Sequence, residues 1–497
     1  MRPCDGAKFI LDLGYTKDGH MYEFSPDDIQ QIQKHGLNID VVHQQLADFV
    51  TGFPYSDIVR PAVIGDGVQA MLGDEFERFY DENRNDYKIV KFVPASGAAT
   101  RMFKDLFEFL SSGVMNKTTQ NVLDNLESFA FWDDLKRVLP ENPTNHDVIE
   151  CLITERGLNY GAMPKALLQF HKYAGTNRTA LAEHLVEGAQ YAESNSSVNI
   201  HFTVSPEHMA GFDAVLGRIL PAYESEFGVK YNISMSVQKA STDTIAVNLD
   251  NTPFRNDDGS LLFRPAGHGA LIENLNDIDG DLIFIKNIDN VCPDDARRDT
   301  IAHKKRLAGL AMQIQKRIFE YLRAMDAGTA DADEIVAFIN DNLGIVVGAD
   351  ADLRAVLNRP LRVCGIIKNT GEPGGGPFWV RGADGGHSLQ IAEPGQIAPE
   401  NISILKNGEF FSPTDLVCMP RDYQGKKFDL TQYVDTTAGF ISEKSKNGRA
   451  LRAMERPGLW NGAMAKWNTV FVETPLNTFT PVKVISDLLG AGHRVNE

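Results

Sequence analysis

Apolar runs alternate with amphipathic stretches along most of the chain. The run at 88–93 is rich in β-branched and aromatic residues and predicts a buried strand. Similar runs at 198–205, 231–238 and 281–289 are separated by helical stretches or loops, and a long helix is expected near 296–327. Such alternation is typical of a mostly parallel sheet covered on both faces. The pattern therefore predicts an α/β fold.

The two ends of the chain depart from this pattern. Residues 1–85 are expected to form a helical segment, because 25–50 begins with a Ser cap, a Pro and two acidic residues. An α/β core is expected over 86–360, with a helical insertion at 103–162 that carries no strand. From 361 to 497, short strands alternate with Gly- and Pro-rich turns, so this part is predicted to be β-rich without forming a separate domain.

Composition narrows the classes of function. Of the 497 residues, 43% are hydrophobic and 23% charged, which is ordinary for a soluble globular protein. The net charge of −18 argues against a broad nucleic-acid surface, because phosphate backbones need clustered Lys and Arg. There is no membrane-length apolar run or signal-peptide core, and the five cysteines are scattered. We therefore expect a cytoplasmic protein without nucleic acid or membrane as a partner.

The turn after the first core strand, PASGAATRMF at 94–103, combines small residues with an arginine. Small side chains let the backbone approach a ligand closely, and the N–H groups at a helix entry suit an anion such as phosphate. A tight turn that merely needs small side chains explains the same residues. On this stretch alone, both interpretations stay open.

Four further polar residues lie at or near strand ends, where open α/β sheets bind ligands. Lys165 can act as a point charge on phosphate, and His268, between two glycines, can donate to a sugar or phosphate oxygen. Asp289 ends a very apolar strand, where a carboxylate is costly unless it is paired, capped or bound to a cation. Glu393 can accept from sugar hydroxyls. The plain alternatives are a solvated lysine, a water-facing histidine, a capping aspartate and a solvent-facing glutamate.

The set of candidates indicates a reaction type. The chain has no His-Glu-x-x-His, nucleophile elbow or Walker lysine pattern. What remains are phosphate binders, one metal ligand and hydroxyl binders. That set suits nucleotidyl transfer, where positioning and charge neutralisation do most of the catalytic work.

Taken in order, these clusters resemble the nucleotide-sugar pyrophosphorylases, nucleotidyltransferases that join a sugar 1-phosphate to a nucleotide. ASGAATRM is similar to their opening loop and PKALLQF to their Pro-Lys element. LLFRPAGHGALIENL, DLIFIKNIDNV and VFVETPLNTFTPVKVISDLL are similar to elements of the UDP-glucose pyrophosphorylase branch. The whole chain also resembles a bacterial family known only as a domain of unknown function. The resemblance implies a Rossmann-like nucleotide-diphospho-sugar transferase fold of the glycosyltransferase-A type.

The resemblance also implies roles for individual residues. Arg101 would lie at the nucleotide phosphates, Lys165 at the α-phosphate and leaving pyrophosphate, and Lys483 at the sugar phosphate. Asp289 would bind Mg²⁺, whereas Asn287 and Glu393 would bind the sugar. The nucleotide would contact Ser96, Gly97, Ala98, Ala99, Thr100, Gln238, Gly267 and His268.

The activity implied is the formation of a nucleotide-sugar and pyrophosphate, with a UDP-sugar as the first choice of product. The partners would be UTP or another nucleoside triphosphate, bound by 86–360, and a sugar 1-phosphate, bound by 361–497. Two departures from the family pattern are Ala99, where glycine is usual, and the 103–162 insertion. A non-catalytic nucleotide-sugar binder on the same fold and a glycosyltransferase are the alternatives.

Overall fold

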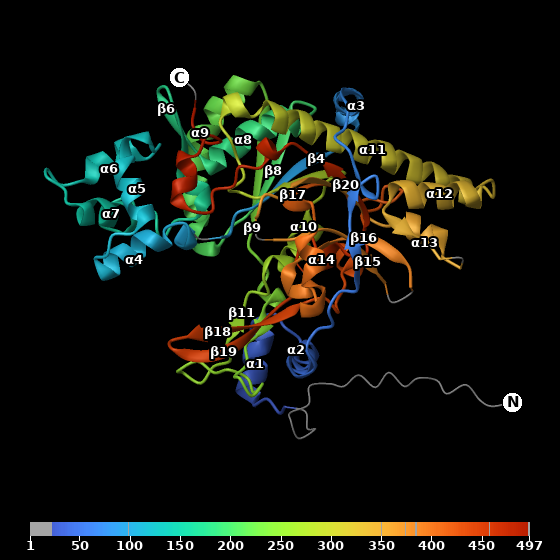
Figure 1. Cartoon of the computed structure of the whole chain (residues 1–497), viewed down its shortest axis with the longest axis horizontal. Coiled ribbons are helices and arrows are strands. Elements are labelled where there is room, and N and C mark those ends of the chain that lie inside the picture. Colours follow the sequence, from blue (N-terminus) through green and yellow to red (C-terminus); the bar gives the residue numbers. More distant parts are fainter. Residues whose placement is uncertain are drawn as a thin grey trace.

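The structure, a computed structural model, has a ten-stranded sheet at its centre, with a smaller lobe below it (Figure 1). The helices α8 and α11 lie along this sheet. The chain is therefore a mixed α/β protein, as the alternation of apolar and amphipathic stretches predicts. The structure describes residues 22–97, 99–348, 350–372, 374–382, 385–456 and 458–495.

Four strands that the sequence predicts form one half of the central sheet. β12 (Leu282–Lys286) pairs in parallel with β4 (Ile89–Pro94), and β4 pairs in parallel with β8 (Ser197–Thr203). β8 in turn pairs in parallel with β9 (Lys230–Ser236). Every residue of β12 is buried, as expected for an interior strand covered on both faces. The carboxyl ends of these strands therefore meet at one edge, where several candidate residues follow them.

The other half of the sheet comes mainly from the C-terminal third. β14 (Leu361–Lys368) and β20 (Asn468–Glu473) are parallel to each other, but β17 (Phe410–Met419) runs antiparallel between β12 and β14. The sequence did not reveal β17. All ten of its residues are buried, yet FFSPTDLVCM is neither alternating nor continuously apolar. The sheet is completed by β2 (Val63–Ile64), β3 (Gly67–Gln69) and β7 (Glu193–Ser194).

The N-terminal segment is only partly helical. α1 (Pro26–Lys34) and α2 (Ile39–Thr51) form as predicted, and Ser25 caps α1. Three short strands follow, which corrects the expectation of a helical segment over 1–85. Strands of two to four residues are too short to show a period in the sequence. One of them joins the separate antiparallel sheet of β1 (Ile58–Pro61), β15 (Gly376–Arg381), β16 (His387–Ala392) and β13 (Ile345–Val346).

The insertion projects from one end of the molecule as a cluster of helices (Figure 1). Its apolar residues Phe109 and Ile149 belong to the same buried cluster as Phe202 on β8. The insertion is therefore packed on the core and is not a loose appendage. Its α-helices are α4 (Lys104–Ser112), α5 (Lys117–Asp124), α6 (Trp132–Val138) and α7 (Asn145–Ile153).

The smaller lobe combines α1 and α2 with two hairpins far away in the sequence (Figure 1). Ile32, Phe49, Ile245 and Met454 share its apolar core. The hairpins pair β10 (Thr244–Ile245) with β11 (Phe263–Arg264), and β18 (Phe440–Lys446) with β19 (Arg449–Glu455).

The remaining elements cover the central sheet or connect its strands. Within the ranges described, none of the helices combines the length and the apolar character that crossing a membrane requires. The remaining helices and strands are α3 (Asp74–Asn83), β5 (Gln169–Tyr173), β6 (Thr176–Thr179), α8 (Ala180–Tyr191), α9 (Met209–Phe227), α10 (Leu271–Asp277), α11 (Arg298–Asp326), α12 (Ala332–Asn342), α13 (Leu353–Leu357) and α14 (Ile402–Lys406).

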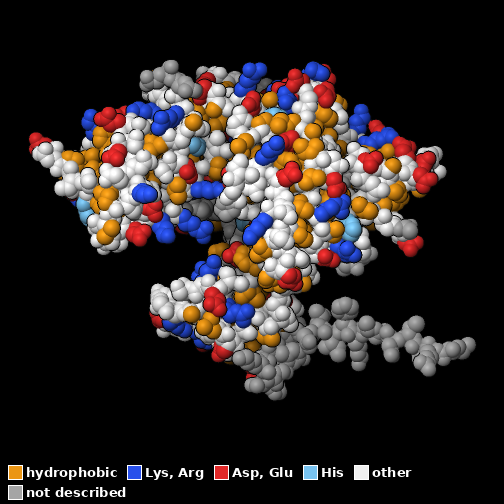
Figure 2. Space-filling view, in the orientation of Figure 1, with side chains coloured by type: hydrophobic (Ala, Val, Ile, Leu, Met, Phe, Trp, Pro, Cys, Tyr) orange, Lys and Arg blue, Asp and Glu red, His pale blue; other side chains and the backbone are white. Residues whose placement is uncertain are grey.

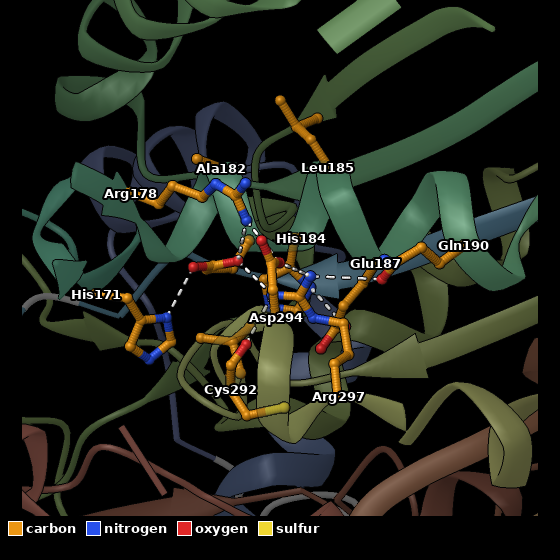
Figure 3. Close-up of polar contacts among 12 residues, drawn as sticks. His171, Arg178, Ala182, His184, Leu185, Glu187, Gln190, Cys292, Asp294 and Arg297 are labelled. Carbon is orange, nitrogen blue, oxygen red and sulfur yellow. Dashed lines mark hydrogen bonds and ion pairs between the residues drawn. The ribbon is translucent and has the colours of Figure 1, made fainter. Parts of the chain in front are cut away.

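The helix α8 carries charged side chains into the core (Figure 3). Glu183 and Glu187 are both fully buried. Glu187 accepts hydrogen bonds from Lys91, at 2.9 Å, and from Lys286, at 2.7 Å. A buried carboxylate is tolerated when it is paired and hydrogen-bonded. These contacts therefore hold α8 in one register against β4 and β12.

Because His493 is buried, the stability of the folded protein is expected to depend on pH. Its Nδ1 lies 2.9 Å from Nε2 of His171, and burial, with His171 adding to the effect, lowers the pKa of His493 to about 3. In the unfolded chain a histidine titrates near pH 6.5. Below that pH the unfolded chain binds a proton that the folded chain does not, so stability falls as pH falls. This histidine alone should contribute a loss of about 1.4 kcal/mol per pH unit between about pH 6 and pH 4.

Urea unfolding of the parent and of His493→Phe at several pH values measures this contribution. We expect the free energy of unfolding of the variant to fall less steeply with acid than that of the parent. The same slope in both proteins would contradict the assignment.

Candidate functional site

The small-residue turn opens toward solvent at the end of β4. Ala95 continues the pairing with β8 through its N–H, which donates to the Thr203 carbonyl at 3.0 Å. The Ser205 hydroxyl donates to the Ser96 carbonyl at 2.9 Å. A Cβ atom added at Gly97 would meet no atom of the described residues within 4 Å, its chain neighbours aside, so the backbone faces open space there. An anion can approach this part of the turn closely.

Ala99 is a different case within the same turn. Its side chain is fully buried, and its N–H donates to the Met163 carbonyl at 3.0 Å. This amide is satisfied within the protein, which corrects the expectation that it faces a phosphate. Thr100 and Arg101 are exposed beside it, whereas Ala98 lies outside the described residues.

Lys165 joins three distant parts of the chain. It follows Pro164 in a short 3-10 turn, and its Nζ donates to Asp289 Oδ2 at 2.6 Å and to the Val482 carbonyl at 2.7 Å. The Lys165 and Asp289 side chains are 16% and 20% exposed. The ion pair is thus open to solvent and to a ligand on one side. This arrangement differs from both alternatives that the sequence left open, a solvated lysine and an aspartate that only caps a turn.

The C-terminal segment that carries Lys483 borders both the ion pair and the small-residue turn. Val482 donates its N–H to the Asp289 carbonyl at 3.0 Å, and Ile485 donates to the Met102 carbonyl at 3.2 Å. The backbone N–H of Lys483 is held by Asp487 at 2.7 Å, and its side chain is exposed. Lys483 therefore lies next to the residue whose carbonyl binds Lys165.

The Lys165–Asp289 pair fits a magnesium ion only when a phosphate supplies further ligands. No group of three or more His, Cys, Asp or Glu side chains in the described part of the chain is placed to hold a metal by itself. Mg²⁺ in nucleotide sites is bound through one or two carboxylates, with phosphates and water completing its shell. Asp289 supplies one such carboxylate. It would hold Mg²⁺ together with a phosphate ligand, in exchange for its contact with Lys165.

His268 and Glu393 form a second group. The Leu459 N–H donates to Nδ1 of His268 at 2.9 Å, so the neutral ring carries its proton on Nε2. This nitrogen lies 3.7 Å from Glu393 Oε1. Gly267 has a φ of +84°, a backbone conformation that favours glycine, and a Cβ atom there would lie 3.3 Å from the Glu455 carboxylate.

Trp460 and Gln396 support this second group, and the sequence had not singled them out. The Trp460 ring stacks on His268, with the centroids 4.0 Å apart and the planes inclined by 10°. Gln396 Oε1 accepts from the Glu393 N–H at 3.0 Å and from Asn461 Nδ2 at 2.9 Å. The contacts of Trp460 with His268 and of Gln396 with Asn461 join residues far apart in sequence, so no local motif marks them.

Gln238 and Asn287 follow β9 and β12 and are both half-buried. Nε2 of Gln238 is shielded from solvent and has no hydrogen-bond partner among the described residues. A buried amide N–H without a partner is costly and needs an explanation, such as a ligand acceptor. Asn287 accepts the N–H of Asn290 through its carbonyl at 3.1 Å.

Hydrogen bonds and ion pairs, made directly or by adjoining residues, thus connect most of the candidates into two groups, with Gln238 and Asn287 in neither. The first consists of the turn 96–101, Lys165, Asp289 and Lys483, and the second of Gly267, His268 and Glu393. Figure 2 shows the molecule hollowed between the main body and the smaller lobe, with Lys and Arg side chains along the rim. A cavity of about 750 Å³ borders the second group, because Gln396 and Asn461 line it, but none of the candidate residues is in its wall.

Fold and site together define a mixed α/β protein with a small-residue turn beside a lysine–aspartate pair. The chain belongs to the family described as Domain of unknown function (DUF4301), whose model matches residues 25–494. The resemblance to a family of this description is thereby confirmed. No curated protein is significantly similar to the chain in sequence.

Three solved structures are similar to the chain at low sequence identity. A mutant UDP-glucose pyrophosphorylase from Leishmania major has 13% identity and a TM-score of 0.46, over 94% of this chain and 79% of that one. The uridine diphosphate N-acetylglucosamine pyrophosphorylase from Trypanosoma brucei has 10% identity and a TM-score of 0.47, with the same coverage. The inositol-1-phosphate CTP transferase from T. maritima has 10% identity and a TM-score of 0.32, over 80% and 91%. Likenesses this low identify neither a ligand nor a reaction.

Proposed function

We propose that the protein is a nucleotidyltransferase that makes a nucleotide-sugar and pyrophosphate from a nucleoside triphosphate, UTP in the first instance, and a sugar 1-phosphate. One observation carries the proposal. Lys165 contacts both Asp289 and the Val482 carbonyl, beside the small-residue turn. Four stretches with phosphate-binding or metal-binding chemistry therefore converge, although they are scattered along the sequence.

The reaction would be an in-line displacement at the α-phosphorus. A phosphate oxygen of the sugar 1-phosphate forms the new bond to this phosphorus, and the bond to the bridging oxygen breaks as pyrophosphate leaves with the electron pair. Lys483 would hold the sugar phosphate, and Lys165 and Arg101 the phosphates of the nucleotide. Mg²⁺, held through Asp289, would supply further neutralisation of phosphate charge. Local cations of this kind outweigh a distant negative surface.

The second group would orient the organic parts of the substrates. The Nε2–H of His268 can donate to an oxygen of the base, ribose or sugar phosphate, with Gly267 beside it. Glu393 and Asn287 would bind sugar hydroxyls, and the unpaired Nε2 of Gln238 would meet an acceptor on the base. A nucleotide base offers carbonyl acceptors of this kind.

A glycosyltransferase usually needs an Asp-x-Asp pair for its metal, and the chain offers only a loose version of it in Asp279 and Asp281. Asp279 and Asp281 precede β12, at the opposite end of this strand from Asp289. Arg421 binds both carboxylates, and Lys88 also binds Asp279 at 2.8 Å. These acids are therefore engaged in ion pairs away from the two candidate groups, where they connect neighbouring loops.

A non-catalytic nucleotide-sugar binder is the second candidate function. The amide of Ala99 is used within the protein, which reduces the number of amides that can hold a triphosphate. Lys165 and Asp289 satisfy each other, as they also would in a protein that binds without turnover. Release of pyrophosphate separates the two functions.

The test is a screen for pyrophosphate release with Mg²⁺, the four common nucleoside triphosphates and a panel of sugar 1-phosphates. We expect release only when both substrates are present. Thermal unfolding is followed in parallel, because a ligand that binds the native state raises the melting temperature. A rise without pyrophosphate would favour the binder. No release and no rise at millimolar ligand would overturn both functions.

We also place the protein in the cytoplasm. The four cysteines within the described ranges are buried and free, as expected where thiols stay reduced. They are Cys151, Cys292, Cys364 and Cys418.

A further inference from the structure

The segment 480–493, here called the C-terminal strap, carries Lys483 and the carbonyl that binds Lys165. Its beginning is attached to the turn that follows β12. The Thr480 N–H donates to Asn290 Oδ1 at 2.9 Å, and the Thr480 hydroxyl donates to the Val291 carbonyl at 3.0 Å. These contacts place the start of the strap. Val482 and Ile485 continue its attachment through their N–H bonds to the carbonyls of Asp289 and Met102, and the residues after Ile485 lead to the far end.

The far end of the strap is anchored in the core. His493 is only 6% exposed. Its Nδ1 lies 2.9 Å from His171 Nε2, and the two rings stack with centroids 5.2 Å apart. The other nitrogen of His171, Nδ1, lies 2.8 Å from Glu183 Oε1. A carboxylate and two imidazoles thus form a continuous buried chain.

The same Glu183 also holds the turn that follows Asp289. Arg297 donates to Glu183 Oε2 and, at 2.7 Å, to the Cys292 carbonyl (Figure 3). The Tyr173 hydroxyl donates to Glu183 Oε1 at 2.8 Å. One buried carboxylate on α8 therefore connects two walls of the candidate site. One wall carries Asp289 and the other carries the strap.

We infer that His493 is a positioning residue, which keeps Lys483 and the Val482 carbonyl beside Lys165 through the chain to His171 and Glu183. The inference rests on the proposed function only in giving Lys483 the sugar phosphate as its ligand. Phenylalanine at 493 would fill the space of the ring but leave Nε2 of His171 without its partner. An unpaired buried polar atom is costly, so the variant strap should leave the core more often.

Hydrogen–deuterium exchange of the ligand-free, full-length protein tests the anchor without any substrate. In His493→Phe, amides within 482–493 should exchange at least tenfold faster than in the parent, with α11 unchanged. His493→Gln keeps a hydrogen-bonding side chain and should restore much of the protection. His146→Phe, which alters an exposed histidine on α7, is the matched control and should leave the strap unchanged. Unaltered exchange in His493→Phe would overturn the inference.

Calorimetry with α-D-glucose 1-phosphate and with UTP plus Mg²⁺ tests the consequence for the site. We expect His493→Phe to weaken glucose 1-phosphate binding about fivefold or more, and UTP binding less than twofold. Equal losses for both ligands, or none, would overturn the positioning role. If the parent binds neither ligand, the proposed function fails with these probes, while hydrogen exchange still decides whether His493 anchors the strap.

Discussion

Replacing Asp289 by asparagine is expected to lower the rate of pyrophosphate release by on the order of a hundredfold or more, with the fold intact. The substitution keeps the shape of the side chain and removes its charge. Mg²⁺ then loses its carboxylate, and Lys165, whose Nζ lies 2.6 Å from that carboxylate in the parent, loses its counter-ion. Steady-state rates, with thermal unfolding to verify the fold, measure the effect.

Asp279→Asn is the matched control for this substitution. Asp279 is another aspartate near an end of β12, but it is exposed and paired with Lys88 and Arg421. Exposed ion pairs contribute about 1 kcal/mol or less, so this variant should keep both its rate and its stability. If Asp289→Asn were as active as Asp279→Asn in a folded protein, Asp289 would have no part in the reaction.

Lys165 and Lys483 are expected to respond differently to removal. Lys165→Ala should lower turnover on the order of a hundredfold, because negative charge on the departing pyrophosphate grows in the transition state. Lys483→Ala should weaken the binding of sugar 1-phosphate roughly tenfold or more, because an ammonium–phosphate contact is charge-assisted. Binding of the triphosphate to Lys483→Ala should stay nearly unchanged.

Calorimetry with each substrate, combined with steady-state rates, separates these effects. Lys316→Ala is a suitable control, because Lys316 is an exposed lysine on α11 that belongs to neither candidate group. If Lys483→Ala binds sugar 1-phosphate as tightly as the parent, the C-terminal part of the proposed site is wrong. A protein that only binds nucleotide-sugars would show no turnover for Lys165→Ala to lose.

Much of the parallel half of the sheet could be predicted from the sequence. β4, β8, β9 and β12 are apolar runs bounded by polar turns, and burial on both faces requires such runs. The caps of α1 and the length of α11 are also local properties. These features depend on neighbours within one or two turns of chain, so a linear pattern is sufficient to reveal them.

The antiparallel strand β17 could not be predicted in this way. Its ten buried residues include Ser412, Thr414 and Asp415, and Asp415 is acceptable in the interior because Lys304 of α11 binds it there. A strand whose polar residues are satisfied by a distant helix has no apolar signature of its own. The short strands β1 to β3 are similar, because their partners and not their own sequence make them strands.

For the candidate site, residue chemistry along the sequence selected a small-residue turn, Lys165 and Asp289, and the resemblance to the nucleotide-sugar pyrophosphorylases added Lys483. Their arrangement became visible only in the folded chain, where Lys165 reaches Asp289 and Val482 and where His493 reaches His171. The internal use of the Ala99 amide is likewise a property of the folded chain. The reason is that side-chain chemistry belongs to each residue, whereas distance and burial depend on how remote segments pack.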